Sequence, residues 1–183
     1  MSELHTTLRC LRDHGLYYDR YAVVREALGP DWGNETPIPL SRILASNGIF
    51  DTVWAFRALI DEPGWTRKYI LDCAERVLPI WQKHHPNNGH PRRAIETARA
   101  FLRGQASKVE VVSAASAVYK ATLGYADTAA AARAVYTAAC YVTFGYEDSA
   151  VTAIEDASYV SPDAATEREW QASRFLEYCM ANA

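Results

Sequence analysis

The stretch that decides the fold covers residues 108–157 and reads KVEVVSAASAVYKATLGYADTAAAARAVYTAACYVTFGYEDSAVTAIEDA. Of its 50 residues, 15 are alanine and five are tyrosine. GYADTA at 124–129 is echoed 21 residues later by GYEDSA at 145–150, and AVYKA at 117–121 by AVYTA at 134–138. In each hexamer the glycine ends one helix, the tyrosine fills the corner, and Asp or Ser/Thr caps the next helix. We predict three short alanine-rich helices that stack closely, because small side chains let helix axes approach.

Helical periodicity continues on both sides of this stretch, and no convincing period-two strand is present. The hexamer KVEVVS at 108–113 is strand-like, but it runs directly into a helical pattern. Asp51 is a good N-cap for the helix that follows it, and Asn47-Gly48 is a typical helix stop. Pro79 should kink its helix, and residues 37–39 should be extended. We expect further helices at about 2–13, 18–28, 40–46, 52–60, 65–84, 91–103 and 161–181.

These patterns predict an all-α protein, a compact single domain of about eight or nine helices. Residues 1–104 form its N-terminal part, and residues 105–183 form an alanine- and tyrosine-rich C-terminal part. The chain has 183 residues, of which 49% are hydrophobic and 22% charged. This is the composition of a soluble globular protein, and it excludes dominant disorder.

The four cysteines indicate a reducing compartment. Cys10, Cys73, Cys140 and Cys179 lie far apart and form no CxxC pair, so zinc and redox patterns are absent. The chain start lacks the basic and apolar regions of a secretory signal. The most apolar stretch, 129–142, is too short to span a membrane. We expect a cytoplasmic protein with no membrane partner.

Charge is unevenly spread along the chain, although the net charge is only −3. Residues 1–56 carry 5 basic and 7 acidic side chains, residues 57–103 carry 9 and 5, and residues 104–183 carry 5 and 10. The acidic C-terminal part either forms ordinary solvated helix faces or faces a basic partner. Its candidate contact residues are Tyr125, Asp127, Tyr146, Glu147, Asp148, Glu155 and Asp156. The alternative role for the tyrosines and acids of the two corners is that of core aromatics and helix caps.

The middle of the chain offers a basic alternative. Arg92, Arg99 and Arg103 lie with Glu96 at helical spacing on one face, with Arg93 nearby, and these arginines could grip phosphates. Arg92 and Arg99 also flank Glu96, which favours ordinary surface pairs. No base-stacking aromatics are interleaved, so nucleic acid is not favoured as a partner.

Common catalytic motifs are absent. The nine glycines lie at least four residues apart, so no dinucleotide or phosphate loop exists, and neither GxSxG nor HExxH occurs. We expect no cofactor and no metal. An alternative hypothesis, a metal-dependent enzyme, uses the histidines of a polar loop with upstream carboxylates. These residues are His84, His85, His90, Asp72 and Glu75.

Three segments carry a family resemblance. FDTVWAFRAL at 50–59, CAERVLPIWQKHHP at 73–86 and PRRAIETARAFLRG at 91–104 resemble the Imm-5-like family of immunity proteins. PIPLSRILASNGIFD at 37–51 resembles the stretch before these motifs in phage-borne members. The match covers about residues 37–104, and the alanine-rich tail agrees with the family only in its general composition. The motif residues, which either hold the fold or touch a partner, are Asp51, Trp54, Arg57, Cys73, Glu75, Arg76, Pro79, Pro91 and Arg92.

The resemblance implies a small all-helical protein that binds and neutralises a toxin and is not an enzyme. We expect the partner to be a protein with a basic surface that docks on the acidic, tyrosine-bearing part, since charge complementarity speeds association. Two alternatives stay open beside the metal-dependent enzyme. One is a phage-encoded anti-defence or host-takeover protein that inhibits a bacterial defence complex, and the other is a helical scaffold that forms homodimers.

Overall fold

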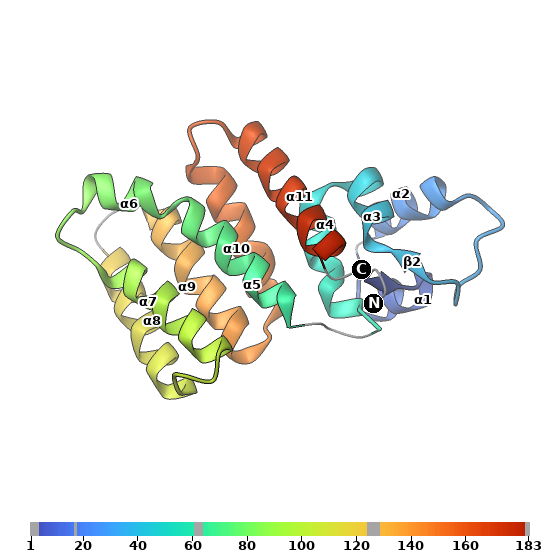
Figure 1. The fold of residues 1–183 in the computed structure, drawn as a ribbon. Coiled ribbons are helices and arrows are strands. Elements are labelled where there is room, and N and C mark those ends of the chain that lie inside the picture. Colours follow the sequence, from blue (N-terminus) through green and yellow to red (C-terminus); the bar gives the residue numbers. More distant parts are fainter. Residues whose placement is uncertain (1–3, 17, 61–63, 124–128, 182–183) are drawn as a thin grey trace. The chain divides into compact units, whose positions relative to one another are not determined.

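In the computed structural model, the described residues are 4–16, 18–60, 64–123 and 129–181. They form eleven α-helices, one 3₁₀ helix and a two-stranded ribbon (Figure 1). The all-α class is confirmed, with more helices than the eight or nine expected. Contacts group these residues into two compact units. One contains residues up to Thr66 together with those from Trp170 onward, and the other is Arg67–Glu169.

The first unit begins with a short antiparallel ribbon that the sequence did not predict. In it, His5 of β1 lies opposite Pro39 of β2, and Thr6 lies opposite Ile38. The extended conformation expected at residues 37–39 is confirmed by β2. The elements of this unit are β1 (His5–Thr6), α1 (Leu8–Asp13), α2 (Tyr18–Leu28), β2 (Ile38–Pro39), α3 (Leu40–Asn47), α4 (Ile49–Trp54) and the 3₁₀ helix η1 (Ala55–Ala58).

The predicted helix at 2–13 is wrong at its start, because α1 begins only at Leu8. Thr7 is extended, and its hydroxyl accepts a hydrogen bond from the Cys10 amide at 3.0 Å, so it is the N-cap. The fully buried Thr6 donates its hydroxyl to the Ala58 carbonyl at 2.6 Å. These two threonines therefore favour an extended entry over another helical turn.

Asp51 is not the N-cap that the sequence predicted. Gly48 ends α3 with a φ of +81°, as expected, but α4 then starts at once at Ile49. Asp51 therefore lies inside the first turn, where it is buried and forms an ion pair with Arg20. Asn47 also donates its side-chain amide to Asp51, at 3.0 Å. The predicted helix at 52–60 is divided between α4 and η1.

Aromatic packing closes the core of the first unit. The ring of Phe56 stacks on that of Phe175 with a centroid distance of 6.2 Å. Trp65 stacks nearly parallel on Tyr178, with centroids 5.4 Å apart. Phe175 and Tyr178 belong to α11 (Ala164–Ala181), so this helix completes the core made by the N-terminal residues.

The second unit is a stack of helices around α9. Its elements are α5 (Trp65–Arg76), α6 (Leu78–His84), α7 (His90–Leu102), α8 (Lys108–Thr122), α9 (Ala129–Phe144) and α10 (Glu147–Val160), with the start of α11. Helix α9 packs against α6, α7, α8 and α10, and six of its alanines are buried (Figure 1). The strand-like hexamer at 108–113 is helical. The prediction of three alanine-rich helices is confirmed.

Pro79 interrupts the predicted helix at 65–84 and does not merely kink it. Helix α5 ends at Arg76, and α6 starts at Leu78 with Pro79 in its first turn. A proline is tolerated there because the first amides of a helix have no intrahelical acceptor. The single helix expected at 65–84 is therefore two helices, α5 and α6.

Candidate functional site

Exposed aromatic rings and carboxylates gather around the end of α9 and along α10. Tyr146 and Tyr159 are 59% and 82% exposed, and Phe144 is 41% exposed. Asp148 and Glu155 are exposed on α10. Large exposed rings beside charged groups are typical of protein interfaces. We name Phe144, Tyr146, Asp148, Glu155 and Tyr159 the aromatic–acidic surface.

The corner between α9 and α10 creates part of this surface. Gly145 has a φ of +70°, and its amide donates to the Tyr141 carbonyl at 2.8 Å, which ends α9 as predicted. The ring of Tyr146 then stacks on that of Phe144, with centroids 5.1 Å apart and planes 10° from parallel. The expectation that Tyr146 fills the corner is wrong. Its ring lies outside, because Phe144 offers it an exposed aromatic platform.

The start of α10 also differs from the predicted cap. Tyr146 occupies the N-cap position, and no side-chain cap hydrogen bond is made there. The Ser149 amide donates to the Tyr146 carbonyl at 2.9 Å. Asp148 is therefore not the N-cap of α10, and its carboxylate lies on the exposed side of the helix.

Asp156 has a structural position in α10. It is 6% exposed, and Arg133 of α9 donates two hydrogen bonds to it, Nη2 at 2.5 Å and Nε at 3.1 Å. The hydrogen bond to Asp156 raises the pKa of the Arg133 guanidinium. Asp156 therefore joins α10 to α9, and we leave it out of the aromatic–acidic surface.

Some candidate residues cannot be placed on this surface. Tyr125 and Asp127, from the first GY-acid hexamer, lie outside the described residues. The side chain of Glu147 also lies outside them, although its backbone starts α10. Of the two GY-acid hexamers, only the second therefore contributes residues to the aromatic–acidic surface.

The basic alternative face is largely engaged in internal contacts. Arg99 Nη2 donates to Asp72 at 2.7 Å and to Glu75 at 2.5 Å. Burial lowers the pKa of the Arg99 guanidinium, but the hydrogen bonds and negative charges of Asp72 and Glu75 together outweigh it, and the pKa is raised. Arg92 donates to Gln82 at 3.1 Å, and Arg103 donates to Gln105 at 2.8 Å.

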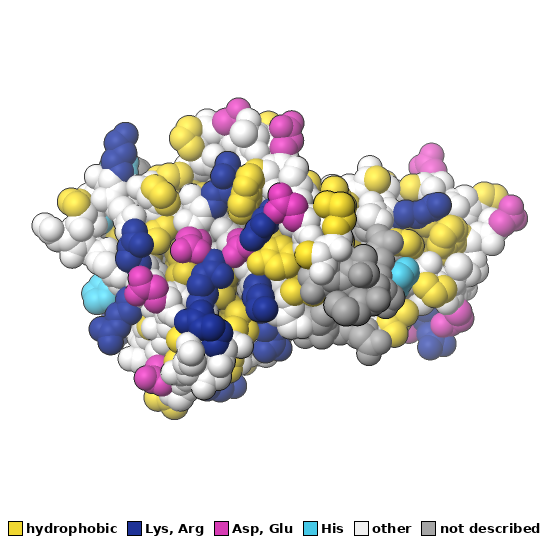
Figure 2. All heavy atoms as spheres, in the orientation of Figure 1, with side chains coloured by type: hydrophobic (Ala, Val, Ile, Leu, Met, Phe, Trp, Pro, Cys, Tyr) yellow, Lys and Arg dark blue, Asp and Glu magenta, His cyan; other side chains and the backbone are white. Residues whose placement is uncertain are grey.

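The expected pairing of Arg99 with Glu96 is replaced by this contact between α5 and α7. Figure 2 shows Lys and Arg side chains gathered over the region of α5 and α7, with Asp and Glu side chains among them. Arg92 and Arg99 join α7 to neighbouring helices, and the face is not a continuous positive patch.

Several of the family motif residues are buried or make contacts within the chain. Trp54 is buried with the Arg57 guanidinium 4.4 Å from its ring centre, and Cys73 is fully buried. Arg76 Nε donates to the buried Glu167 at 2.8 Å. Pro91 is in the first turn of α7, where proline is favoured.

The histidine loop does not assemble a metal site in the described part of the chain. Among those residues no group of three or more His, Cys, Asp or Glu side chains could hold a metal ion. The His85 ring packs on Trp81 at a centroid distance of 4.1 Å. His90 lines a separate cavity between α7 and α8, together with Arg93 and Glu110. In the described residues, these histidines and carboxylates therefore do not form the set of metal ligands that the metal-dependent enzyme hypothesis requires.

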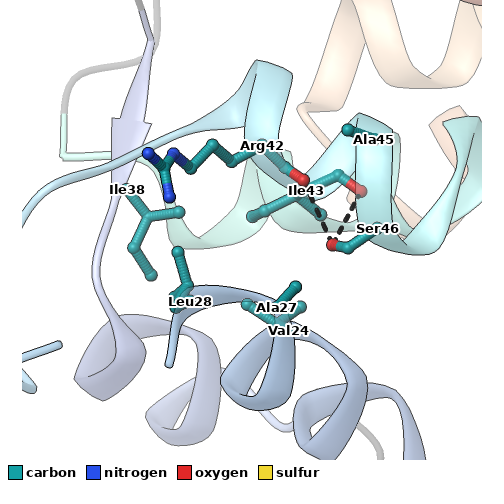
Figure 3. A pocket seen from close by; sticks show the side chains of 8 residues that line it. All are labelled: Val24, Ala27, Leu28, Ile38, Arg42, Ile43, Ala45 and Ser46. Atoms are coloured by element: carbon teal, nitrogen blue, oxygen red, sulfur yellow. Dashed lines mark hydrogen bonds between the residues drawn. The ribbon is translucent and has the colours of Figure 1, made fainter. Parts of the chain in front are cut away.

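A cavity of about 330 Å³ lies between α2 and α3 in the first unit (Figure 3). Ile38 and Ile43 line it and are already buried, at 0% and 1% exposed, and Val24 is 1% exposed. Among the described residues that line it, Arg42 carries a charge, and its guanidinium lies 5.0 Å from the Trp32 ring centre.

Sequence reasoning missed the exposed side of α8. Val109, Val112, Tyr119 and Leu123 are all exposed there. Their spacing of three, seven and four residues places them on one side of a helix. That spacing was visible in the sequence, but apolar residues at helical spacing normally mark a core face, and here they do not.

No helix in the described part of the chain is long and apolar enough to cross a membrane. A family model described as Imm-5 like putative immunity protein matches residues 65–178. The match extends through the alanine-rich tail and most of α11, beyond the limit at 104 that the sequence motifs indicated. It excludes FDTVWAFRAL at 50–59, which the sequence analysis had counted among the motifs. No curated protein sequence and no solved structure matches the chain.

Proposed function

Since this chain belongs to the Imm-5 like putative immunity proteins, we propose that it binds and neutralises a protein toxin without catalysis. The toxin docks on the aromatic–acidic surface through a basic face of its own. The inhibitor acts by covering that face, in a complex of one inhibitor and one toxin.

The observation that carries this proposal is the exposure of Tyr146 and Tyr159 beside Asp148 and Glu155. Tyrosine is enriched among residues that dominate binding energy, because its ring supplies contact area at low entropic cost. Exposed carboxylates steer a basic partner toward the surface. The Arg133–Asp156 contact fixes the helix that carries both acids, so the surface is largely formed before binding.

The test is affinity capture with the tagged chain from cells that contain the toxin, followed by native mass measurement. We expect a single partner with 1:1 stoichiometry. The variant Asp148→Asn/Glu155→Gln should associate more slowly and depend less on salt, because it removes two steering charges.

The matched control is Glu96→Gln/Glu169→Gln, which removes two exposed carboxylates elsewhere on the same unit. It should behave like the wild-type chain. Equal loss of binding in both variants would reject the aromatic–acidic surface. Absence of any partner from toxin-containing cells would reject the immunity function itself.

A further inference from the structure

The cavity of about 330 Å³ between α2 and α3 has an apolar interior and an opening to solvent. Val24, Ile38 and Ile43 line its buried side and are at most 1% exposed. Ala27 of α2 and Ala45 of α3 also line it, and both are exposed. Since each of these two helix positions carries only a methyl group, the space between the helices stays unfilled.

An apolar ligand suits this space better than water does. Protein interiors rarely contain voids of this size, because the atoms that line a void lose dispersion contacts. A buried water needs about two to four polar partners, and most of the side chains that line this cavity are aliphatic. Pockets that bind small molecules have this composition, an apolar lining with a few polar groups that orient the ligand.

One end of the cavity carries a positive charge. Figure 3 shows the Arg42 side chain running from α3 to a position above Ile38, with Ala45 and Ser46 at the other end. The Arg42 guanidinium lies over the ring of Trp32, which supports the face of the cation. Such a contact leaves the N–H groups at the edge of the guanidinium free to donate. Among the described residues, no oxygen accepts a hydrogen bond from them.

The loop after α2 fixes the position of this charge. Arg25 Nη1 donates to the Trp32 carbonyl at 2.6 Å, and Trp32 Nε1 donates to the Thr36 carbonyl at 3.3 Å. The indole that supports Arg42 is therefore held from two sides, and the cation is positioned before a ligand binds. A ligand then loses less free energy to the ordering of the site.

The other polar group of the cavity does not compete with Arg42 as a donor. The Ser46 hydroxyl lies 2.7 Å from Asn47 Oδ1 and 3.1 Å from the Arg42 carbonyl, so its single hydrogen is used within α3 (Figure 3). The guanidinium is thus the donor that the cavity offers to a ligand, and it favours an anionic group at that end. A carboxylate matches its geometry, because its two oxygens accept two parallel hydrogen bonds.

The volume of the cavity limits the length of the ligand. An apolar cavity of about 150 Å³ holds benzene. A cavity of about 330 Å³ therefore has room for roughly ten to twelve non-hydrogen atoms. A straight-chain carboxylate of about eight to ten carbons has this size, which makes it a medium-chain alkyl carboxylate.

We propose that the cavity between α2 and α3 binds a medium-chain alkyl carboxylate. The carboxylate accepts hydrogen bonds from Arg42, and the alkyl chain lies against Val24, Ile38 and Ile43. This inference goes beyond the proposed function. The cavity lies outside the residues 65–178 that match the family model, and it belongs to the unit that does not carry the aromatic–acidic surface.

The test is isothermal titration of the full chain with octanoate, octan-1-ol and octylammonium, which share one alkyl chain and differ in the head group. We expect octanoate to bind with a Kd of about 100 µM or tighter. Octan-1-ol should bind about tenfold more weakly or worse, because it lacks the charge that meets Arg42, and octylammonium should not bind. Absence of octanoate binding, or an equal Kd for octanoate and octan-1-ol, overturns the proposal.

A charge variant tests the role of Arg42. Arg42→Gln should weaken octanoate binding about tenfold or more and leave the Kd of octan-1-ol unchanged. The matched control is Arg12→Gln, at an exposed arginine of α1, which should leave both values unchanged. An unchanged Kd for octanoate in Arg42→Gln overturns the proposal.

A filled variant tests the position of the alkyl chain. Ala27→Leu/Ala45→Leu fills the cavity from both helices and should abolish binding of octanoate and octan-1-ol. Ala22→Leu, at an exposed alanine of α2 that does not line the cavity, is the control. Leucine favours helices, and thermal unfolding checks that the double variant folds. Should it not fold, octanoate must raise the melting temperature of the wild-type chain and not that of Arg42→Gln. Retained octanoate binding in the filled variant overturns the proposal.

Other outcomes separate this inference from the proposed function. A captured toxin that binds Ala27→Leu/Ala45→Leu more weakly, together with a wild-type chain that does not bind octanoate, would assign the cavity to a side chain of the toxin and overturn the inference alone. Octanoate binding by a chain that captures no partner from toxin-containing cells would support the inference and reject the proposed function.

Discussion

Arg133 and Asp156 form a two-pronged contact between α9 and α10, with Nη2–Oδ1 at 2.5 Å and Nε–Oδ2 at 3.1 Å. The carboxylate is buried, whereas the arginine is about half exposed. This is a bidentate, charge-assisted pair, in which two N–H groups of the guanidinium bind both oxygens of the carboxylate. It fixes the relative orientation of the two side chains as well as their distance. It positions the helix that carries Asp148, Glu155 and Tyr159, and it distinguishes the buried acid Asp156 from the exposed acids of the same helix.

Loss of this contact should destabilise the second unit. Asp156→Asn leaves the Arg133 fork without its charged acceptor, and we expect a loss of about 1–3 kcal/mol in the free energy of unfolding, typical of hydrogen bonds to charged groups. Urea unfolding measures this. Glu96→Gln, at an exposed position on α7, should change stability by less than about 0.5 kcal/mol. Equal effects would contradict the structural role of Asp156.

The contact between Arg99 and the carboxylates of α5 predicts that the arginines of α7 differ in how much they contribute to stability. Arg99→Gln should destabilise the chain, because Asp72 and Glu75 lose their shared cation across the helix interface. Arg93→Gln, at an exposed position on the same helix, should leave the melting temperature nearly unchanged. Differential scanning calorimetry distinguishes the two variants, and equal melting temperatures would contradict the assignment of Arg99 to the fold.

The capping box at the start of α8 predicts a pH dependence. Hydrogen bonds from the Ser107 amide and hydroxyl, both at 2.7 Å, lower the pKa of Glu110. A carboxylate whose pKa is lower in the folded chain stabilises the fold above about pH 4.3, the pKa of free glutamate. This stabilisation is lost as pH falls through the lower folded-state pKa.

Glu110→Gln should therefore be less stable than the wild-type chain near neutral pH. The difference should shrink as pH falls below the folded-state pKa, because the wild-type carboxylate is then neutral as well. Urea unfolding of both proteins across this range measures it. A stability difference that stays constant with pH would contradict the contribution of the Glu110 charge to the capping box of α8.

Cys140 should react slowly with alkylating agents. Burial raises the pKa of its thiol, so the reactive thiolate is scarce near neutral pH. Its alkylation rate in the folded chain, measured by peptide mass spectrometry, should be well below that in urea. An equal rate in both conditions would show that the thiol is more accessible than its position beside Tyr136 implies.

The sequence predicted the helices well where one periodic pattern was bounded by a strong stop. Gly48 and Gly145 both adopt positive φ and end their helices as expected. The errors arose where tertiary contacts outweigh local preference. Asp51 has the chemistry of an N-cap, but Arg20, 31 residues away in the chain, draws it into an ion pair. Thr6 is held extended by Ala58, and no local pattern reveals that contact.

The candidate site was predicted less completely than the fold. The sequence indicated the acidic, tyrosine-bearing hexamer at 145–150, and Tyr146 and Asp148 are indeed exposed. The sequence could not show which of the adjacent acids Glu155 and Asp156 binds Arg133. Neighbouring residues on a helix point in different directions, and only the packing of α10 on α9 decides which carboxylate is buried. The sequence also could not reveal the exposed apolar side of α8, since apolar residues at helical spacing look alike whether they face a core or solvent.

The most direct measurement is the affinity of the captured toxin for three forms of the chain, by isothermal titration. These are the wild type, Asp148→Asn/Glu155→Gln, and Arg92→Gln/Arg93→Gln. We predict that the acidic double variant weakens Kd about tenfold or more, equivalent to roughly 1.4 kcal/mol, and that the arginine double variant leaves Kd unchanged. Weakening by the arginine variant with an unchanged Kd for the acidic variant would contradict the account, because binding would then lie on α7 and not on the aromatic–acidic surface.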